Sequence, residues 1–180
     1  MITQLDFSIL YAIQNIRNDL FDWFFPFITK LGNSGIFWIL LGICLICFKK
    51  TRTCGICVLA CLAIGALIGE VFIKNVICRQ RPCIQQPIEN MLVAIPTSFS
   101  FPSGHSASSF TAATAIFLNH RKAGIAAYIL AALIAFSRLY CYVHFPTDVL
   151  CGAILGIIVA CLVTHKIKKY ISSKQTNQNL

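Results

Sequence analysis

Five apolar stretches constrain the fold of this chain more than any other feature of its sequence. They cover approximately residues 31–48, 54–73, 104–118, 123–143 and 145–164. Each is close to the roughly 20 residues that a helix needs to cross the hydrocarbon core of a bilayer. Because lipid offers no hydrogen bonds to an open backbone, such segments cross as helices. We therefore expect an all-α, polytopic integral membrane bundle of about five transmembrane helices.

The composition supports a membrane domain and argues against a nucleic-acid partner. Charged residues make up 12% of the 180 residues, whereas about a quarter are charged in typical soluble domains. The net charge is +9, but the cations lie at the ends of apolar stretches and form no basic run interleaved with aromatic residues. We expect one membrane-embedded domain over residues 1–170, a polar tail over residues 171–180, and no nucleic-acid binding. The sequence leaves the oligomeric state open.

The first 30 residues have a different pattern. One amphipathic helix is predicted over residues 4–20, with an apolar stripe made of Leu5, Ile9, Ile13, Ile16 and Leu20. Thr3 and Asp6 resemble a capping box at its start. The aromatic group at 22–27 is typical of a membrane interface. We expect residues 1–30 to lie on the membrane surface, and the alternative is a short first span.

Basic residues set the expected orientation. Lysine and arginine clusters follow the first, third and fifth stretches, at positions 49–52, 121–122 and 166–174. The positive-inside rule makes that face of the cell membrane cytoplasmic, together with the C-terminus. The loops at 74–102 and 138–147 then lie on the extracytoplasmic face. Four cations in these loops oppose the topological preference and need another explanation. They are Lys74, Arg79, Arg81 and Arg138.

The loop before the fifth stretch brings three ionisable residues together, Arg138, His144 and Asp148. A carboxylate near an imidazole accepts its ring N–H, which fixes the tautomer and leaves the other nitrogen free as a base or nucleophile. The planar guanidinium of Arg138 suits phosphate oxygens. The segment therefore indicates an anion site with an oriented histidine. The alternative is a helix-ending loop with ordinary interfacial polar residues.

The third stretch begins with Pro102-Ser103-Gly104-His105. Proline is well tolerated at a helix start, where unpaired backbone N–H groups attract anions. Gly104 lets the backbone come close to a ligand. Positions 106–113 are rich in Ser, Ala and Thr, and such small residues permit close helix packing. We therefore expect a central helix that is shielded from lipid.

The second stretch ends in a basic segment that contains Lys74 and Arg81. Glu70 lies one helical turn before Lys74, so the two side chains are expected to pair. Arg79 is expected to steer anions without touching a bound phosphate. Two further histidines lie beside cytoplasmic cations and are expected to be interfacial, not catalytic. They are His120 and His165.

Together these segments supply three cations, backbone donors, a hydroxyl and two histidines, but only one acid close to a histidine. This inventory suits phosphoryl transfer in which one histidine attacks phosphorus and the other protonates the leaving oxygen. A metal-dependent phosphatase would need clustered carboxylates. The cysteine pairs at 44–47 and 54–57 have zinc-like spacing, but cysteine in apolar helices is more often a small hydrophobe. We expect no metal and no cofactor, and leave open whether Cys78 and Cys83 pair.

Three segments resemble, in order and with full internal spacing, the signature motifs of the type-2 phosphatidic acid phosphatase superfamily. They are Lys74-x(6)-Arg81-Pro82, Pro102-Ser103-Gly104-His105 and Ser137-Arg138-x(5)-His144-x(3)-Asp148. The resemblance implies a helical core similar to that of the vanadium haloperoxidases. It also implies a role for each matching residue. His144 would be the nucleophile that forms a phosphohistidine, Asp148 would orient it, and His105 would be the general acid. The expected phosphate contacts are Lys74, Arg81, Ser103, Gly104 and Arg138.

The function that this resemblance implies is hydrolysis of a lipid phosphate or diphosphate at the extracytoplasmic face, with the lipid tail in the bilayer. The short chain and its amphipathic start resemble bacterial undecaprenyl-diphosphate phosphatases of the superfamily. Many of those enzymes have Asp where Gly104 stands, and Gly there is similar to phosphatases of phosphatidic acid or phosphatidylglycerophosphate, which is the alternative. Two further alternatives are an anion transporter and a non-catalytic lipid-binding protein.

Overall fold

The computed structural model describes the backbone of residues 2–178 and the side chains of residues 3–174. This part of the chain is helical and contains no strand. Its elements are α1 (Ile2–Gln14), α2 (Asp19–Leu31), the 3₁₀ turn η1 (Asn33–Gly35), α3 (Ile36–Cys47), α4 (Arg52–Ala66), the π-helical η2 (Leu67–Ile73), α5 (Lys74–Ile77), α6 (Pro82–Gln85), α7 (Gly104–Asn119), α8 (Arg121–Tyr140) and α9 (Pro146–Gln178). The expected polar tail continues α9 as helix to Gln178, and its last two residues lie outside the described part.

Helix α7 lies at the centre of the bundle, as its small residues predict. It packs against α4, α8 and α9, and positions 111–116 are all buried. The core around it contains Trp38, whose indole donates a hydrogen bond of 3.0 Å to the Ser109 hydroxyl of α7. A helix that is surrounded by other helices needs little apolar bulk, because its neighbours and not its own side chains exclude lipid.

Two glycines of α9 allow close contact with α7. A Cβ atom at Gly152 would lie 2.6 Å from the Ser103 carbonyl oxygen, and one at Gly156 would lie 2.5 Å from the Ala107 carbonyl oxygen. Both distances are shorter than a carbon–oxygen contact allows, and the opposing atoms belong to a helix backbone that cannot move aside easily. The absence of side chains at these two positions therefore sets the distance between α7 and α9.

By length and composition, three segments of the described chain are able to cross a membrane. They are Arg52–Gln85, Arg121–Tyr140 and Pro146–Lys174. A fourth span results if α2 and the segment Asn33–Cys47 act as one unit with a bend of 42°. The multi-span helical architecture is thus confirmed. Helix α7, with 16 residues, is shorter than the length usually needed to cross the hydrocarbon core.

The N-terminal segment differs from the single helix predicted over residues 4–20. Helix α1 ends at Gln14, and Asn18 caps the start of α2 by accepting a hydrogen bond from the Phe21 amide. The predicted stripe is only partly turned inward: Leu5 is 63% exposed and Ile9 is 38% exposed. The buried face of α1 instead consists of Asp6, Phe7, Leu10 and Ile13. Asp6 is therefore no capping residue.

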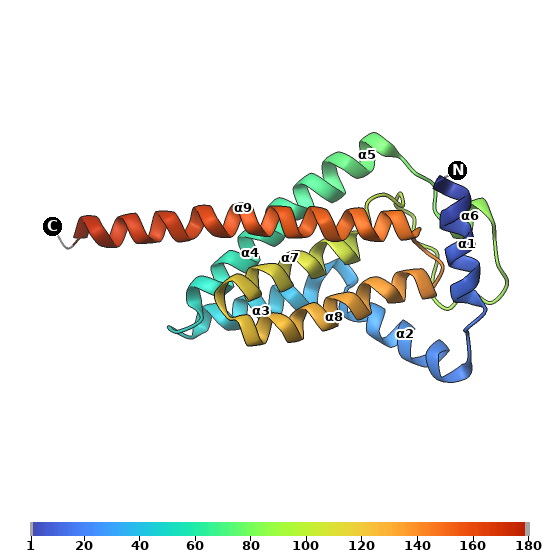
Figure 1. Ribbon diagram of the computed structural model, residues 1–180, viewed down its shortest axis with the longest axis horizontal. Helices are drawn as coiled ribbons and strands as arrows, with labels where there is room; N and C mark the ends of the chain where they lie inside the picture. Colours follow the sequence, from blue (N-terminus) through green and yellow to red (C-terminus); the bar gives the residue numbers. More distant parts are fainter. Residues whose placement is uncertain (1, 179–180) are drawn as a thin grey trace.

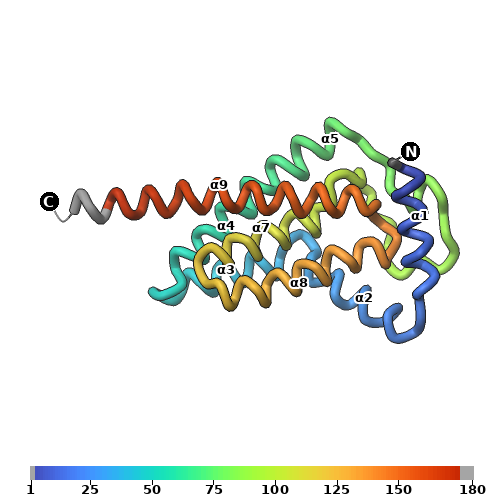
Figure 2. The backbone as a smooth tube through the Cα atoms, viewed as in Figure 1, coloured from blue at the N-terminus to red at the C-terminus, as the bar shows by residue number. Residues whose placement is uncertain are grey.

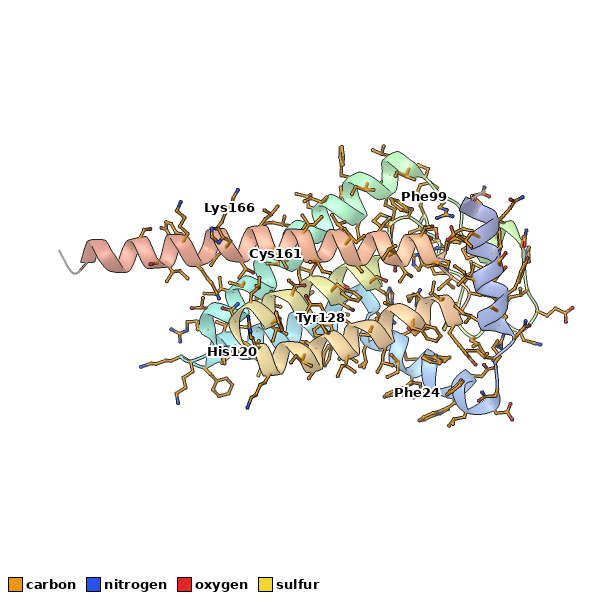
Figure 3. All side chains as sticks on the ribbon, in the orientation of Figure 1. Phe24, Phe99, His120, Tyr128, Cys161 and Lys166 are labelled. Carbon is orange, nitrogen blue, oxygen red and sulfur yellow. The ribbon has the colours of Figure 1, made fainter. Side chains whose placement is uncertain are left out.

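The two ends of the bundle differ in what they carry (Figure 1). Helix α1 lies across one end, roughly perpendicular to α9, and the long segment between α5 and α7 wraps around the same end. The tube in Figure 2 shows that the connection between α8 and α9 also returns there, whereas α9 extends well past the other end. His120 and Lys166 lie toward that opposite end (Figure 3). The three predicted motif segments therefore gather at one end of the molecule.

The contact between α7 and α9 gives a test of the packing argument. Replacement Gly156→Ala should lower the free energy of unfolding by about 1–3 kcal/mol, because the new methyl group overlaps helix backbone. Gly65→Ala is the matched control, since a Cβ there meets nothing closer than 3.4 Å. Thermal unfolding of the detergent-solubilised variants measures the difference. An equal melting temperature for Gly156→Ala and the wild type would contradict the close contact.

Candidate active site

The three motif segments meet at a cavity of about 1010 Å³. Its walls include parts of α2, η1, α4, η2, α5, α7, α8, the segment 92–98 and the connection between α8 and α9. Six predicted site residues border it: Lys74, Arg81, Gly104, His105, Arg138 and His144. Asp148 and Ser103 do not border it. Predicted site residues that are up to 70 positions apart in the sequence thus border one cavity, and both motif histidines are among them.

His144 lies in the short connection between α8 and α9 and is 2% exposed. Its Nε2 atom is 3.0 Å from Nη1 of Arg81. Because a guanidinium only donates hydrogen bonds, this contact assigns the lone pair to Nε2 and the ring proton to Nδ1. Burial lowers the pKa of His144 to about 3, and the nearby arginines add to the effect. The imidazole is therefore neutral at neutral pH, with a lone pair at the cavity.

Asp148 is fully buried in the first turn of α9 and approaches His144 less directly than expected. Its Oδ2 atom is 3.7 Å from Nδ1 of His144, which is too long for a hydrogen bond. The Ser100 hydroxyl lies beside both groups: it donates to Asp148 Oδ2 at 2.5 Å and is 3.4 Å from His144 Nδ1. The Phe145 amide donates to the same oxygen at 2.9 Å. Ser100 is thus part of the histidine's surroundings, although sequence reasoning assigned it no role.

The cations are held in three different ways. Lys74 contacts both carboxylate oxygens of Glu70 at 2.7 Å, which confirms the predicted pair. Arg81 donates to the carbonyl oxygens of Ser98, Phe99 and Val143. These neutral acceptors fix the guanidinium without cancelling its charge. Lys74 is therefore compensated before any ligand binds, whereas Arg81 is positioned but not neutralised.

Arg138 lies at the end of α8 and is 5% exposed. Its Nη1 atom donates to the Thr29 hydroxyl at 2.6 Å. Its Nε atom is buried without a hydrogen-bond partner in the described part of the chain. Because a buried charged donor without an acceptor is costly, and Arg138 borders the cavity, this orphan N–H indicates that the missing acceptor is a bound anion.

The structure places the Ser103 hydroxyl at the start of α7, outside the cavity lining, and its expected phosphate contact stays a prediction. Ser103 is fully buried and caps the helix by accepting hydrogen bonds from the Ser106 amide and hydroxyl. Gly104 does border the cavity. A Cβ atom at Gly104 would overlap the Glu70 carboxylate. Glycine at this position thus leaves room for Glu70, and the Ser103 hydroxyl shapes the helix start.

His105 contacts a segment that lies outside the three motifs. Its Nε2 atom is 3.0 Å from Oδ1 of Asn33, in the bend between α2 and α3. A Cβ atom at Gly32 would lie 2.5 Å from the His105 ring, so the bend packs directly on the imidazole. The sequence signal for this bend was Gly32-Asn33-Ser34-Gly35 between two apolar runs. The predicted residue roles did not include Asn33 or Thr29.

Arg79 pairs with two carboxylates outside the cavity lining. Its guanidinium contacts Asp148 Oδ1 at 2.6 Å and Asp6 Oδ2 at 2.7 Å, and it does not border the cavity. Its charge is shared by two carboxylates, and its expected role in steering anions stays a prediction. Among the described residues no group of three or more His, Cys, Asp or Glu side chains is placed to hold a metal ion, and Cys78 and Cys83 are both free thiols.

The buried neutral state of His144 predicts a pH effect on stability. Its folded-state pKa lies below the value of about 6.5 in an unfolded chain. The unfolded chain therefore binds the proton first, and stability is lost progressively as the pH falls from about 6.5 toward 3. Between pH 7 and 5.5 we expect a loss of roughly 1 kcal/mol from this group. Melting curves should show a smaller loss in His144→Asn, whereas the exposed-site control His120→Asn should behave as the wild type. An unchanged loss in His144→Asn would contradict the assignment.

Comparisons with known proteins agree with this geometry. A model of the PAP2 superfamily matches residues 55–172. An undecaprenyl-diphosphatase of Sulfolobus acidocaldarius is 35% identical over 137 residues, which cover 76% of this chain and 66% of that protein. The crystal structure of a PAP2-type phosphatidylglycerolphosphate phosphatase from Bacillus subtilis superimposes with a TM-score of 0.76 at 31% identity, over 93% of this chain and 86% of that one.

A bacterial vanadium-dependent iodoperoxidase has the same fold, with a TM-score of 0.73 at 15% identity over 91% of this chain and 49% of that one. This likeness confirms the expected similarity of the helical core to vanadium haloperoxidases. The matched region of the family contains both cavity histidines and all three motif segments. The chain belongs to the PAP2 superfamily, whose membrane members include lipid phosphatases.

Proposed function

We propose that this membrane lipid phosphatase hydrolyses undecaprenyl diphosphate at the extracytoplasmic face, through a phosphohistidine on His144. The observation that carries the proposal is the pair of imidazoles on one cavity, with an unprotonated Nε2 of His144 held beside Arg81. A buried neutral imidazole is nucleophilic because it needs no deprotonation before attack. The alternative substrate is a phosphatidic acid or phosphatidylglycerophosphate, and the chemistry at the histidines would be the same.

The first half-reaction forms a nitrogen–phosphorus bond. Nε2 of His144 attacks the terminal phosphorus, and the bond from phosphorus to the lipid-side oxygen breaks. His105 transfers a proton to that oxygen, so that the lipid phosphate leaves. In the second half-reaction a water molecule gives a proton to His105 and its oxygen attacks the phosphohistidine. Inorganic phosphate then leaves, and both histidines return to their starting states.

The cations stabilise the transferring group. Arg81 and Arg138 border the cavity next to His144, and the unpaired Nε of Arg138 supplies a donor without rearrangement. Donors that are already in place stabilise a developing negative charge more than donors that must reorient. Lys74 reaches the phosphate only by sharing or leaving Glu70. These groups provide the positive charge that a metal ion supplies in other phosphatases, so the proposed reaction is independent of metal.

The diphosphate assignment has support on the leaving-group side of the cavity. Lys30, Asn33 and His105 all border the cavity, and Asn33 contacts His105, the proposed general acid. The Lys30 side chain makes no hydrogen bond or ion pair with any described residue. When a diphosphate is cleaved, the leaving group is itself a charged phosphate, whereas a phosphate monoester releases a neutral alcohol. An unpaired cation near the general acid therefore favours a diphosphate. Apolar wall residues Leu62, Ala66 and Ile95 suit the adjoining lipid chain.

The orientation proposal combines the charge pattern with the fold. The cavity lies at the end of the bundle that α1 crosses, and the basic clusters predicted to be cytoplasmic include Lys166 at the other end (Figure 3). With the basic end in the cytoplasm, the C-terminus is cytoplasmic and the cavity faces the extracytoplasmic side. A diphosphate head group reaches the cavity there while its chain remains in the bilayer.

Phosphate release from purified protein tests the reaction. Undecaprenyl diphosphate should release inorganic phosphate at the same rate with and without EDTA. His144→Ala should lower the rate by at least about a thousandfold, because the nucleophile is lost. His165→Ala, at an exposed site away from the cavity, serves as the control and should retain the wild-type rate. Loss of activity in EDTA would refute metal independence, and a His144→Ala rate within about tenfold of the wild type would refute the nucleophile.

Paired substrates test the diphosphate assignment. Lys30→Ala should lower kcat/KM for farnesyl diphosphate by about tenfold, the effect of one charge-assisted contact. The value for farnesyl monophosphate should change less than twofold. Lys49→Ala, in the turn before α4, removes a cation of the same kind far from the cavity. An equal decrease for both substrates in Lys30→Ala would argue against a subsite for the leaving phosphate.

A further inference from the structure

The buried face of α1 contains a carboxylate that the phosphatase chemistry described above does not use. Asp6 is 1% exposed. Its Oδ1 atom accepts a hydrogen bond of 3.1 Å from the Thr147 amide. Its Oδ2 atom accepts from the Thr147 hydroxyl and from Arg79 Nη2, both at 2.7 Å. These three hydrogen bonds compensate the loss of water around the buried carboxylate and fix its position.

Arg79 extends these contacts to the catalytic carboxylate. While Nη2 contacts Asp6, Nη1 donates to Asp148 Oδ1 at 2.6 Å and to the Thr147 hydroxyl at 2.7 Å. The guanidinium carbon lies 3.9 Å from the ring centre of Phe145, and that ring packs edge-on against Phe7 of α1. The planar fork of one arginine thus joins α1 to the connection that carries His144.

The Arg79 contact fixes the one Asp148 oxygen that His144 and Ser100 do not use. Oδ2 faces Ser100, the Phe145 amide and His144, whereas the recorded side-chain contact of Oδ1 is with Arg79. A carboxylate held at both oxygens does not rotate. Without Arg79 or its second anchor at Asp6, Oδ2 would be free to turn away from Ser100. The Ser100 hydroxyl, which lies 3.4 Å from Nδ1 of His144, would then lose the partner that orients it.

We propose that Asp6 and Arg79 are positioning residues for Asp148, so that α1 is part of the catalytic unit and not only a surface anchor. The inference rests on the proposed phosphatase chemistry at His144. It does not depend on which lipid phosphate is hydrolysed. Asp6 lies outside the family match, which begins at residue 55, so the similarity to the superfamily does not assign this role.

A positioning role and a purely structural role of the Asp6–Arg79 pair predict different kinetics: only the positioning role lowers kcat in a folded variant. Neither Asp6 nor Arg79 borders the cavity, so their removal should leave substrate binding intact. Asp6→Asn keeps the size and the hydrogen-bonding capacity toward Thr147 but removes the charge that orders Arg79. We expect its kcat to fall about tenfold, the lower range for partners of a catalytic group, with KM changed less than twofold. Arg79→Lys keeps the charge but lacks the planar guanidinium that contacts two carboxylates at once. We expect the same tenfold lower kcat, with KM changed less than twofold.

Asp22→Asn provides the matched control. Asp22 also belongs to the N-terminal segment and pairs with an arginine, Arg17, at 2.8 Å, but this pair has no contact with Asp148. The kcat and KM of Asp22→Asn should remain within twofold of wild type. Melting temperatures of all variants show whether each is folded. If Asp6→Asn does not fold, Arg79→Lys provides the test alone.

The combined variant Asp6→Asn/Arg79→Lys adds a second criterion. Because both residues act through Asp148, its kcat should be close to that of the worse single variant, not the product of the two effects. The substrate is whichever of farnesyl diphosphate and farnesyl monophosphate the wild type hydrolyses. Wild-type protein that hydrolyses neither of these two substrates would refute the proposed function. Folded Arg79→Lys and Asp6→Asn variants with wild-type kcat, or with a raised KM alone, would overturn the positioning role.

Discussion

Mutual repulsion of cations around one histidine is the constraint on which the rest of this structure depends. Lys74, Arg81 and Arg138 border the same cavity, and at short range in a poorly solvated site like charges repel strongly. Each is held in a different way: Lys74 is paired with Glu70, Arg81 contacts neutral carbonyl oxygens, and Arg138 contacts the Thr29 hydroxyl on one side only. The remaining imbalance is a positive potential at the cavity, which a phosphate bound there would neutralise in the proposed reaction. In the proposed reaction, the same positive potential would attract the phosphate and stabilise its transfer.

The helical scaffold makes this concentration of charge possible. Small residues of α7 and the bare backbone of Gly152 and Gly156 bring α9 close to α7. That contact places the start of α7, with His105, beside the start of α9, with Asp148. A backbone hydrogen bond of 3.0 Å from the Ser103 amide to the Asp148 carbonyl oxygen joins the two starts directly. The distance between α7 and α9 at the centre of the bundle therefore determines the distance between His105 and Asp148 at its end.

Local sequence patterns predicted the parts of this site that depend on local spacing. The Glu70–Lys74 pair follows from one helical turn, and the central position of α7 follows from its small residues. The position of Asp6 was not predictable in this way, because the apolar stripe of α1 is not its buried face. The 15–18 break between α1 and α2 has no proline or glycine to mark it. The partners of Arg79 were not predictable because they lie 73 and 69 residues away, and long-range charge pairing leaves no local pattern.

The proposed reaction requires that His144 becomes covalently phosphorylated during turnover. Rapid mixing with substrate, quenching in alkali and mass spectrometry of the proteolytic fragments would locate the phosphoryl group, since phosphohistidine survives at high pH. The expected result is a phosphorylated fragment that contains His144, formed at least as fast as inorganic phosphate is released. Phosphate release that proceeds with no phosphorylated fragment, or with the label on His105 instead, would contradict it.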